Sequence, residues 1–180
     1  IKDAGLFCLL EEQGAQSVEA HFQNEEGDVI LDRAISGMLE ELQPNLFEED
    51  LARKMDFGHT FSYGLETRHE ANLFHGEAVL LDIIVSTLIA KARNLLSEEE
   101  TSRIFHLIDL LGITLDTSIL DPHLLWQSLE ERTCHRNGLQ RVPLPHGIGG
   151  CVFVNDIKIG DIEFAVKILE DWITVKYDHT

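Results

Sequence analysis

Basic residues are scarce in this sequence. Its 180 residues include 14 Lys and Arg against 32 Asp and Glu, which gives a formal net charge of -18 at pH 7. A surface this acidic repels phosphate backbones, so nucleic acid is excluded as a main partner. A small phosphorylated substrate is not excluded, because a local basic pocket can oppose the field of the whole protein.

Cysteine is also rare, and long apolar runs are missing. Cys8, Cys134 and Cys151 form no CxxC pair, so we interpret them as buried core thiols in a reducing compartment. The most apolar run, residues 78–90, is interrupted by Asp82 and is shorter than the ~18–20 residues of a membrane-spanning helix. No basic segment followed by an apolar one opens the chain. We therefore expect a cytoplasmic protein that has no membrane partner.

Apolar residues recur at helical spacing along most of the chain. Gly14 is predicted to end the first helix, and Pro44 follows the end of the second. Ser97 and Glu100 form a capping-box pattern. Helices are predicted at residues 6–14, 28–42, 65 onward, 75–93, 97–111, 121 onward and 160–172, and a β-hairpin at 139–154. The predicted fold class is mainly α, with residues 1–180 forming a single helical domain with one short hairpin.

Two histidines at predicted helix junctions are the main candidates for a ligand site. His59 follows a glycine, and His75 precedes one at the start of the longest predicted helix. Helix N-termini direct partial positive charge outward, which suits an anionic ligand, and neutral imidazole is a common zinc ligand. The spacing of this pair alone is unspecific, so capping and packing roles stay open for both residues.

Longer motifs around the two histidines carry a family resemblance. Residues 56–62 (DFGHTFS) and 73–79 (LFHGEAV) together resemble the metal-binding segments of the sugar phosphate cyclase superfamily, which includes 3-dehydroquinate synthase. The resemblance extends from residue 2 to residue 156. It implies the helical C-terminal domain of the dehydroquinate synthase-like fold. It also implies that His59 and His75 bind Zn²⁺ or another divalent metal such as Co²⁺.

Other segments resemble one branch of that superfamily. Residues 38–46 (MLEELQPNL) and 135–145 (HRNGLQRVPLP) are similar to the 2-epi-5-epi-valiolone synthase branch. Asp56 and Tyr63 stand where 3-dehydroquinate synthase has Asn and a second His, and His135 falls near its Lys-Lys segment. The valiolone branch usually has proline at the position of Tyr63, so this chain departs from both branches there.

The branch resemblance implies a carbon-oxygen lyase that converts sedoheptulose 7-phosphate to 2-epi-5-epi-valiolone with loss of phosphate. NAD would accept a hydride and later return it. The resemblance implies that Asp56 and His135 are catalytic groups that touch the polyol or the phosphate and line one cleft. The phosphate-binding residues would be Arg53, Lys54 and Arg136.

Simpler roles remain open for these residues. Asp56 can cap a helix, Arg53 and Lys54 can be solvated, and residues 135–136 can end a helix favourably. Two alternative functions also remain: 3-dehydroquinate synthase, and a catalytically inactive helical scaffold or interaction module.

Two parts of the family's active site do not occur in this sequence. No G-x-G-x-x-G turn lies between a predicted strand and a helix, although the family has an NAD-binding Rossmann-like domain before its metal domain. The resemblance places the third metal ligand, a Glu in a Glu-x-x-Lys segment, just upstream of Ile1. We therefore expect a C-terminal part of a longer enzyme. It should be inactive alone and homodimeric when intact, with a cleft that opens toward Ile1.

Overall fold

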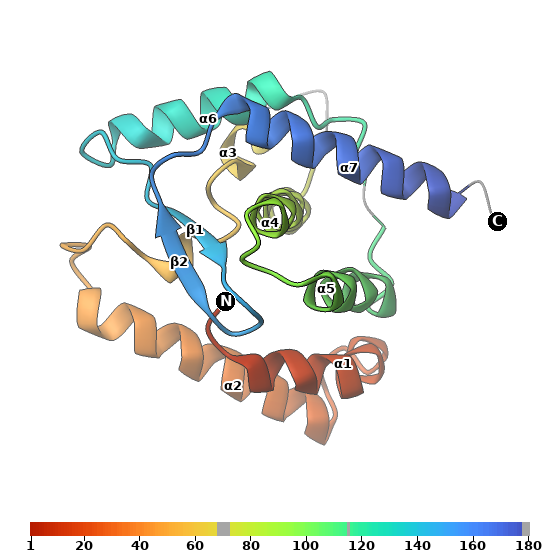
Figure 1. Ribbon diagram of the computed structural model, residues 1–180. Helices are drawn as coiled ribbons and strands as arrows, with labels where there is room; N and C mark the ends of the chain where they lie inside the picture. The colour runs from red at the N-terminus through yellow and green to blue at the C-terminus, as the bar shows by residue number, and fades with distance from the viewer. Residues whose placement is uncertain (68–72, 115, 178–180) are drawn as a thin grey trace.

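The computed structural model describes residues 1–67, 73–114 and 116–177 of the chain. Helices make up most of its regular structure (Figure 1), and the single antiparallel pair of strands lies against them. The elements in chain order are α1 (Ala4–Glu19), α2 (Glu25–Leu42), the 3₁₀ turns η1 (Gln43–Asn45) and η2 (Lys54–Asp56), α3 (Ser62–Glu66), α4 (His75–Ala92), α5 (Glu98–Leu110), α6 (Pro122–Cys134), β1 (Val142–Pro145), β2 (Cys151–Val154) and α7 (Ile159–Tyr177). The prediction of a mainly α fold with one short hairpin is confirmed.

Helix α4 lies at the centre of the molecule. In Figure 1 it is seen end-on, with α6 and α7 above it, α5 beside it and the α1–α2 pair below. Every residue from 84 to 90 is buried. A helix that is apolar on nearly all its faces can be stable only if other elements enclose it. Its neighbours supply Leu125 from α6 and Leu169 from α7, which are both wholly buried.

The first helix is longer than predicted. It continues through Gly14 to Glu19, and Gly14 itself is buried. A Cβ at this position would lie 2.9 Å from Cδ2 of Leu111, at the end of α5. Gly14 therefore allows α1 to approach α5 closely and does not end the helix.

The hairpin forms where the sequence predicts it, but its first strand is shorter. Val142 pairs with Val154, and the strands are joined by a turn over residues 146–150. The predicted strand residue Gln140 lies outside the ladder because its side-chain amide bonds to the backbone of Ile157. The Gln140 Nε2 donates to the carbonyl at 3.0 Å, and the Ile157 N–H donates to Oε1 at 2.9 Å.

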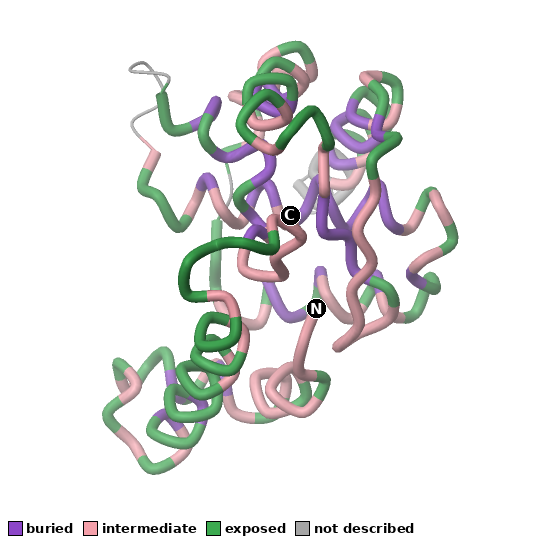
Figure 2. The backbone as a smooth tube through the Cα atoms, turned by 90° about the vertical axis from the view of Figure 1, so that its left-hand side faces the viewer, coloured by how far each residue is buried: buried purple, intermediate pink, exposed green. Residues whose placement is uncertain are grey.

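The α1–α2 pair is the least buried layer of the fold. Figure 2 shows the buried segments gathered away from these two helices. On α2 only Gly27 and Ile30 are buried. Apolar side chains exposed on α2 and just after it are Val29, Leu31, Ile35, Met38, Leu39, Leu42, Leu46 and Phe47. This surface is called the α2 apolar face below.

The prediction that the cysteines belong to the buried core is wrong for all three. Cys8 and Cys134 are exposed, Cys151 is half-buried, and all three are free thiols. Cys8 faces Arg103, whose Nη2 lies 3.7 Å from its sulfur, and Cys134 is the last residue of α6. Over the described ranges, no helix has the length and hydropathy needed to cross a bilayer.

The capping box of α5 gives a test of the fold. The Glu100 N–H donates to Ser97 Oγ at 3.1 Å, and the Ser97 N–H donates to Glu100 Oε2 at 2.9 Å. Because Ser97→Ala removes one of these partners, we expect a loss of about 1 kcal/mol in the free energy of unfolding, measured with urea. Ser102→Ala, at an exposed position of the same helix, is the control and should change stability by less than about 0.5 kcal/mol. Equal effects of the two substitutions would contradict the assignment of the cap.

Candidate metal site

The two predicted metal ligands lie next to each other. His59 follows η2, and His75 is the first residue of α4. The centroids of their imidazole rings are 5.3 Å apart, and the ring planes are tilted by 47°. Both residues are exposed, so a ligand can reach the pair from solvent. This convergence is what two ligands of one ion require, and their metal-binding role stays a prediction.

Gly58 brings the His59 segment against α4. Its φ of 82° lies in the left-handed region, which favours glycine. A Cβ at this position would lie 2.8 Å from Cγ1 of Val79, on the second turn of α4. Because Gly58 has no Cβ, the backbone just before His59 approaches the helix that carries His75 more closely than a larger residue at position 58 would allow.

One nitrogen of each imidazole is already held by an oxygen. His75 Nδ1 lies 3.1 Å from Glu66 Oε2, and His59 Nδ1 lies 3.4 Å from the Phe57 carbonyl. An N–H at each Nδ1 satisfies these oxygens and leaves the Nε2 lone pairs available. Metal-binding histidines commonly have this arrangement, in which a carboxylate or carbonyl fixes the tautomer and the ring orientation. The donor set therefore fits a divalent metal.

The described residues supply two candidate metal ligands and not a complete set. Catalytic zinc sites use three protein ligands and keep one position open. Across residues 1–67, 73–114 and 116–177, no group of three His, Cys, Asp or Glu side chains could hold an ion. The resemblance places a third ligand just upstream of Ile1, and that stays a prediction.

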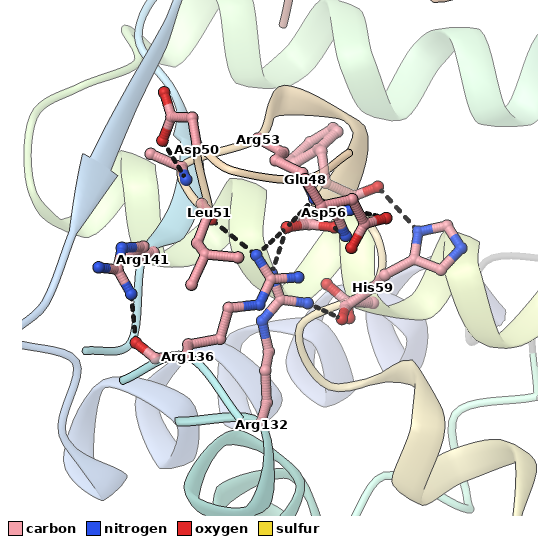
Figure 3. A network of polar contacts seen from close by, with 12 residues as sticks. Glu48, Asp50, Leu51, Arg53, Asp56, His59, Arg132, Arg136 and Arg141 are labelled. Atoms are coloured by element: carbon pink, nitrogen blue, oxygen red, sulfur yellow. Dashed lines mark hydrogen bonds and ion pairs between the residues drawn. The ribbon is translucent and has the colours of Figure 1, made fainter. Parts of the chain in front are cut away.

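Asp56 lies at the centre of a buried ion-pair network (Figure 3). Its side chain is 7% exposed and contacts three guanidinium groups. Arg53 Nη2 is 2.7 Å from Oδ1, and Arg136 Nη1 is 2.6 Å from Oδ2. Arg132 Nη2, from α6, lies 3.0 Å from the same Oδ2. Arg53 also pairs with Glu48, so three positive charges face two carboxylates and the network carries one excess positive charge in an otherwise acidic protein.

Two opposing effects act on the pKa of Asp56. Burial alone would raise it, but hydrogen bonds from Arg53 and Arg136 and the charge of Arg132 outweigh burial. The pKa of the carboxyl therefore lies below its usual value, and Asp56 is ionised near neutral pH. In this structure Asp56 does not cap a helix.

Arg132 is a site residue that sequence reasoning did not find. Its Nη1 donates to the backbone carbonyl of His59, which ties α6 to the metal-ligand segment. Burial lowers the pKa of this guanidinium. Its Nε has no hydrogen-bond partner within the described part of the chain. Arg132 lies in the last turn of α6 and Arg136 follows the helix two residues after its end; this spacing of four residues, in a chain with few basic residues, is the pattern that could have indicated it.

A cavity of about 640 Å³ reaches His59, one of the two histidines. It lies between the α1–α2 layer and α4 and α5, and its lining is mostly apolar. Ile1 and Lys54 are also among the lining residues, so the cavity extends to the beginning of the chain. Lys54 is paired there with Glu41, at 2.9 Å.

Asp56 and His135 do not share this cavity. Neither belongs to its described lining, and the expectation that both line one cleft with the metal ligands stays a prediction. Asp56 is turned into the arginine network, and His135 is exposed at the C-cap of α6. The arginines predicted to bind phosphate, Arg53 and Arg136, contact Asp56.

The fold is a mainly helical one in which two candidate metal ligands, His59 and His75, lie together. Residues 1–133 match the family described as 3-dehydroquinate synthase C-terminal. The chain belongs to this family.

Similar proteins indicate the branch within the family. The chain is 45% identical over 177 residues to a 2-epi-5-epi-valiolone synthase of Streptomyces albus, covering 95% of this chain and 43% of that protein. A solved 2-epi-5-epi-valiolone synthase from Streptomyces hygroscopicus, with NAD⁺ and Zn²⁺ bound, superposes with a TM-score of 0.91 at 44% identity, over 95% of this chain and 48% of that one. A 3-dehydroquinate synthase of Prochlorococcus marinus is 28% identical over 172 residues, covering 94% of this chain and 46% of that protein. The chain thus spans less than half the length of these relatives.

The arginine network predicts a pH-dependent effect of Asp56→Asn. The substitution removes the anion shared by three guanidinium groups, of which Arg53 keeps Glu48 as a partner, so we expect a loss of about 3 kcal/mol in unfolding free energy at pH 7. The pKa of Asp56 is lowered by folding, so its contribution is present above the unfolded value of 3.8 and is lost as the pH falls through the lower folded value. The difference between the two proteins should therefore shrink below pH 4, as measured by urea unfolding. Asp32→Asn, at an exposed position of α2, is the control, and a difference independent of pH would contradict the network.

Proposed function

We propose that this chain is the metal-binding part of a sugar phosphate cyclase that converts sedoheptulose 7-phosphate to 2-epi-5-epi-valiolone. The reaction eliminates phosphate, which makes the enzyme a carbon-oxygen lyase, and it uses NAD⁺. The observation that carries the proposal is the His59–His75 pair, whose Nδ1 atoms face oxygens and whose Nε2 atoms are available for one ion. The valiolone branch is supported by 45% identity, against 28% for the 3-dehydroquinate synthase.

Within this chain, His59 and His75 would hold Zn²⁺, or another divalent ion such as Co²⁺, through their Nε2 atoms. When bound, the metal supplies Lewis-acid polarisation of substrate oxygens. The Nδ1 contacts would fix the orientation of the two rings, whose centroids lie 5.3 Å apart. Glu66 and the Phe57 carbonyl are therefore the groups that orient the ligands.

Positive charge for the substrate phosphate comes from two places. Lys54 lies on the cavity wall and is paired with Glu41, and the three guanidinium groups of Arg53, Arg132 and Arg136 exceed the carboxylates of Asp56 and Glu48 by one positive charge. A phosphate between them would meet a locally positive region in a protein of net charge -18. His135, exposed next to Arg136, would contribute a donor to the polyol or the phosphate.

The scaffold alternative does not explain the arrangement of the site. A helical module without catalysis has no need for two exposed imidazoles that converge and are each oriented by an oxygen. We also propose a cytoplasmic location, which the three free thiols support. The homodimeric state of the intact enzyme rests on the family resemblance.

Zinc binding by this chain tests the proposed ligands. Calorimetric titration with Zn²⁺ should show one site. His59→Ala and His75→Ala should each weaken it by at least about tenfold, because each removes one of the described ligands. His123→Ala, which removes an exposed histidine of α6, is the matched control and should leave the affinity unchanged. Equal affinities for all four proteins would rule out the histidine pair as a metal site.

A substrate comparison tests the reaction. The chain alone, supplied with NAD⁺, Zn²⁺ and each sugar phosphate, should be inactive because it spans less than half of its relatives. A chimera in which it replaces the matched part of the Streptomyces hygroscopicus synthase should cyclise sedoheptulose 7-phosphate. It should not act on the 3-dehydroquinate precursor or on glucose 6-phosphate, and its His59→Ala variant should be inactive. Turnover of the dehydroquinate precursor alone would contradict the branch, and a folded chimera without any turnover would favour the scaffold.

A further inference from the structure

Asp82 is a buried carboxylate that the proposed reaction does not use. It lies on α4, seven residues after His75, and its side chain is wholly buried. Burial raises the pKa of this carboxyl to about 6. An ionisable group in such a place is expensive to keep, because it has lost its hydration. An apolar residue would suit the enclosed helix better, so the position calls for a function.

Asp82 accepts hydrogen bonds from the beginning of α3. Its Oδ2 accepts from the backbone N–H groups of Phe61 and of Ser62, the latter at 2.9 Å. Its Oδ1 accepts from the hydroxyl of Ser86, one turn further along α4, at 3.3 Å. The first N–H groups of a helix have no acceptor within that helix, and the side chain of its own N-cap residue normally accepts a hydrogen bond from one of them. Here a neighbouring helix provides the acceptor.

This contact reaches both histidines through short paths. Phe61 is two residues after His59, and its side chain is wholly buried, so the segment that carries His59 is anchored where it enters α3. The other end of α3 carries Glu66, whose carboxylate lies 3.1 Å from His75 Nδ1. Because α3 is one short helix, a shift at its beginning also moves Glu66.

We propose that Asp82 is a positioning residue for the His59–His75 pair. It joins the His59 segment and α3 to the same helix that begins with His75, so α4 sets the separation of the two rings before any metal binds. The proposal rests on the proposed function only in taking this pair as a metal site. The geometric claim concerns the free chain and can be tested without metal.

Two substitutions separate the hydrogen bonds of Asp82 from its charge. Asp82→Asn keeps an oxygen that can accept from Phe61 and Ser62, and Asp82→Ala removes it. In the metal-free chain, Asp82→Ala should abolish hydrogen-exchange protection of these two amides and the NMR contact between the imidazole rings. The Asn variant should retain both. If the Ala variant does not fold, Asp82→Thr replaces it. Threonine has nearly the volume of aspartate, but its hydroxyl oxygen lies one bond closer to the backbone of α4 and so farther from the N–H groups of Phe61 and Ser62.

Zinc affinity supplies the second measurement. Loss of a group that orients metal ligands typically weakens metal binding 10–100-fold, so we expect that range for Asp82→Ala and a change below about threefold for Asp82→Asn. Ile84→Val, at a wholly buried position of the same helix, is the control for lost stability alone and should bind Zn²⁺ as the parent does.

The outcomes distinguish this proposal from the function on which it builds. If His59→Ala binds Zn²⁺ as tightly as the parent, the proposed metal site is wrong. The positioning role of Asp82 is then decided by two measurements alone, the NMR contact between the imidazole rings and the protection of the Phe61 and Ser62 amides. Loss of the ring contact and of the amide protection in Asp82→Ala supports the positioning role, provided that Asp82→Asn and Ile84→Val retain them. Unchanged ring contact and unchanged zinc affinity in Asp82→Ala would overturn it, as would equal losses in Ile84→Val.

Discussion

The enclosure of α4 is the constraint on which the rest of the structure depends. A helix that is apolar on nearly all its faces needs neighbours on every side, and α3, α5, α7 and β1 provide them. Its two ends reach solvent: Ala92 is exposed at the last residue, and His75 and Gly76 are exposed in the first turn. The candidate metal site therefore lies where this enclosed helix emerges at the surface.

Ion pairs around Asp56 hold the segment before His59 against the end of α6. The chain has 14 basic residues, and three of them converge on Asp56. Without that carboxylate, their mutual repulsion would separate the segment before His59 from the end of α6. Arg132 extends the same network to the His59 carbonyl. An ionised Asp56 is thus a structural requirement of the site, whatever contact it makes with a substrate.

Local patterns predicted much of the fold. The caps of α5 and α6 and the hairpin turn depend on residues close in sequence, so Ser97, Asp121 and the glycines near residue 148 were found. The extent of α1 was missed because Gly14 serves a contact with distant Leu111.

In the site, too, local sequence patterns indicated some residues and missed those that depend on distant contacts. Family motifs indicated His59 and His75, whereas Glu66, Asp82 and Arg132 act through folded contacts that no local pattern encodes. Arg132, for example, reaches a carbonyl 73 residues away in the chain. Asp82 interrupts an apolar run, and sequence alone gave no reason for the interruption. Its reason is two backbone amides about twenty residues earlier in the chain.

The α2 apolar face has a consequence for how molecules of this chain meet in solution. Val29 is 55% exposed, Ile35 51% and Phe47 86%, so two copies can lower their contact with water by joining these surfaces. The net charge of -18 opposes that approach at long range. Added salt shortens the reach of this repulsion to ~10 Å at 0.1 M and leaves the apolar attraction intact. We therefore expect self-association of this chain to increase with ionic strength, because the repulsion between its acidic residues is then screened.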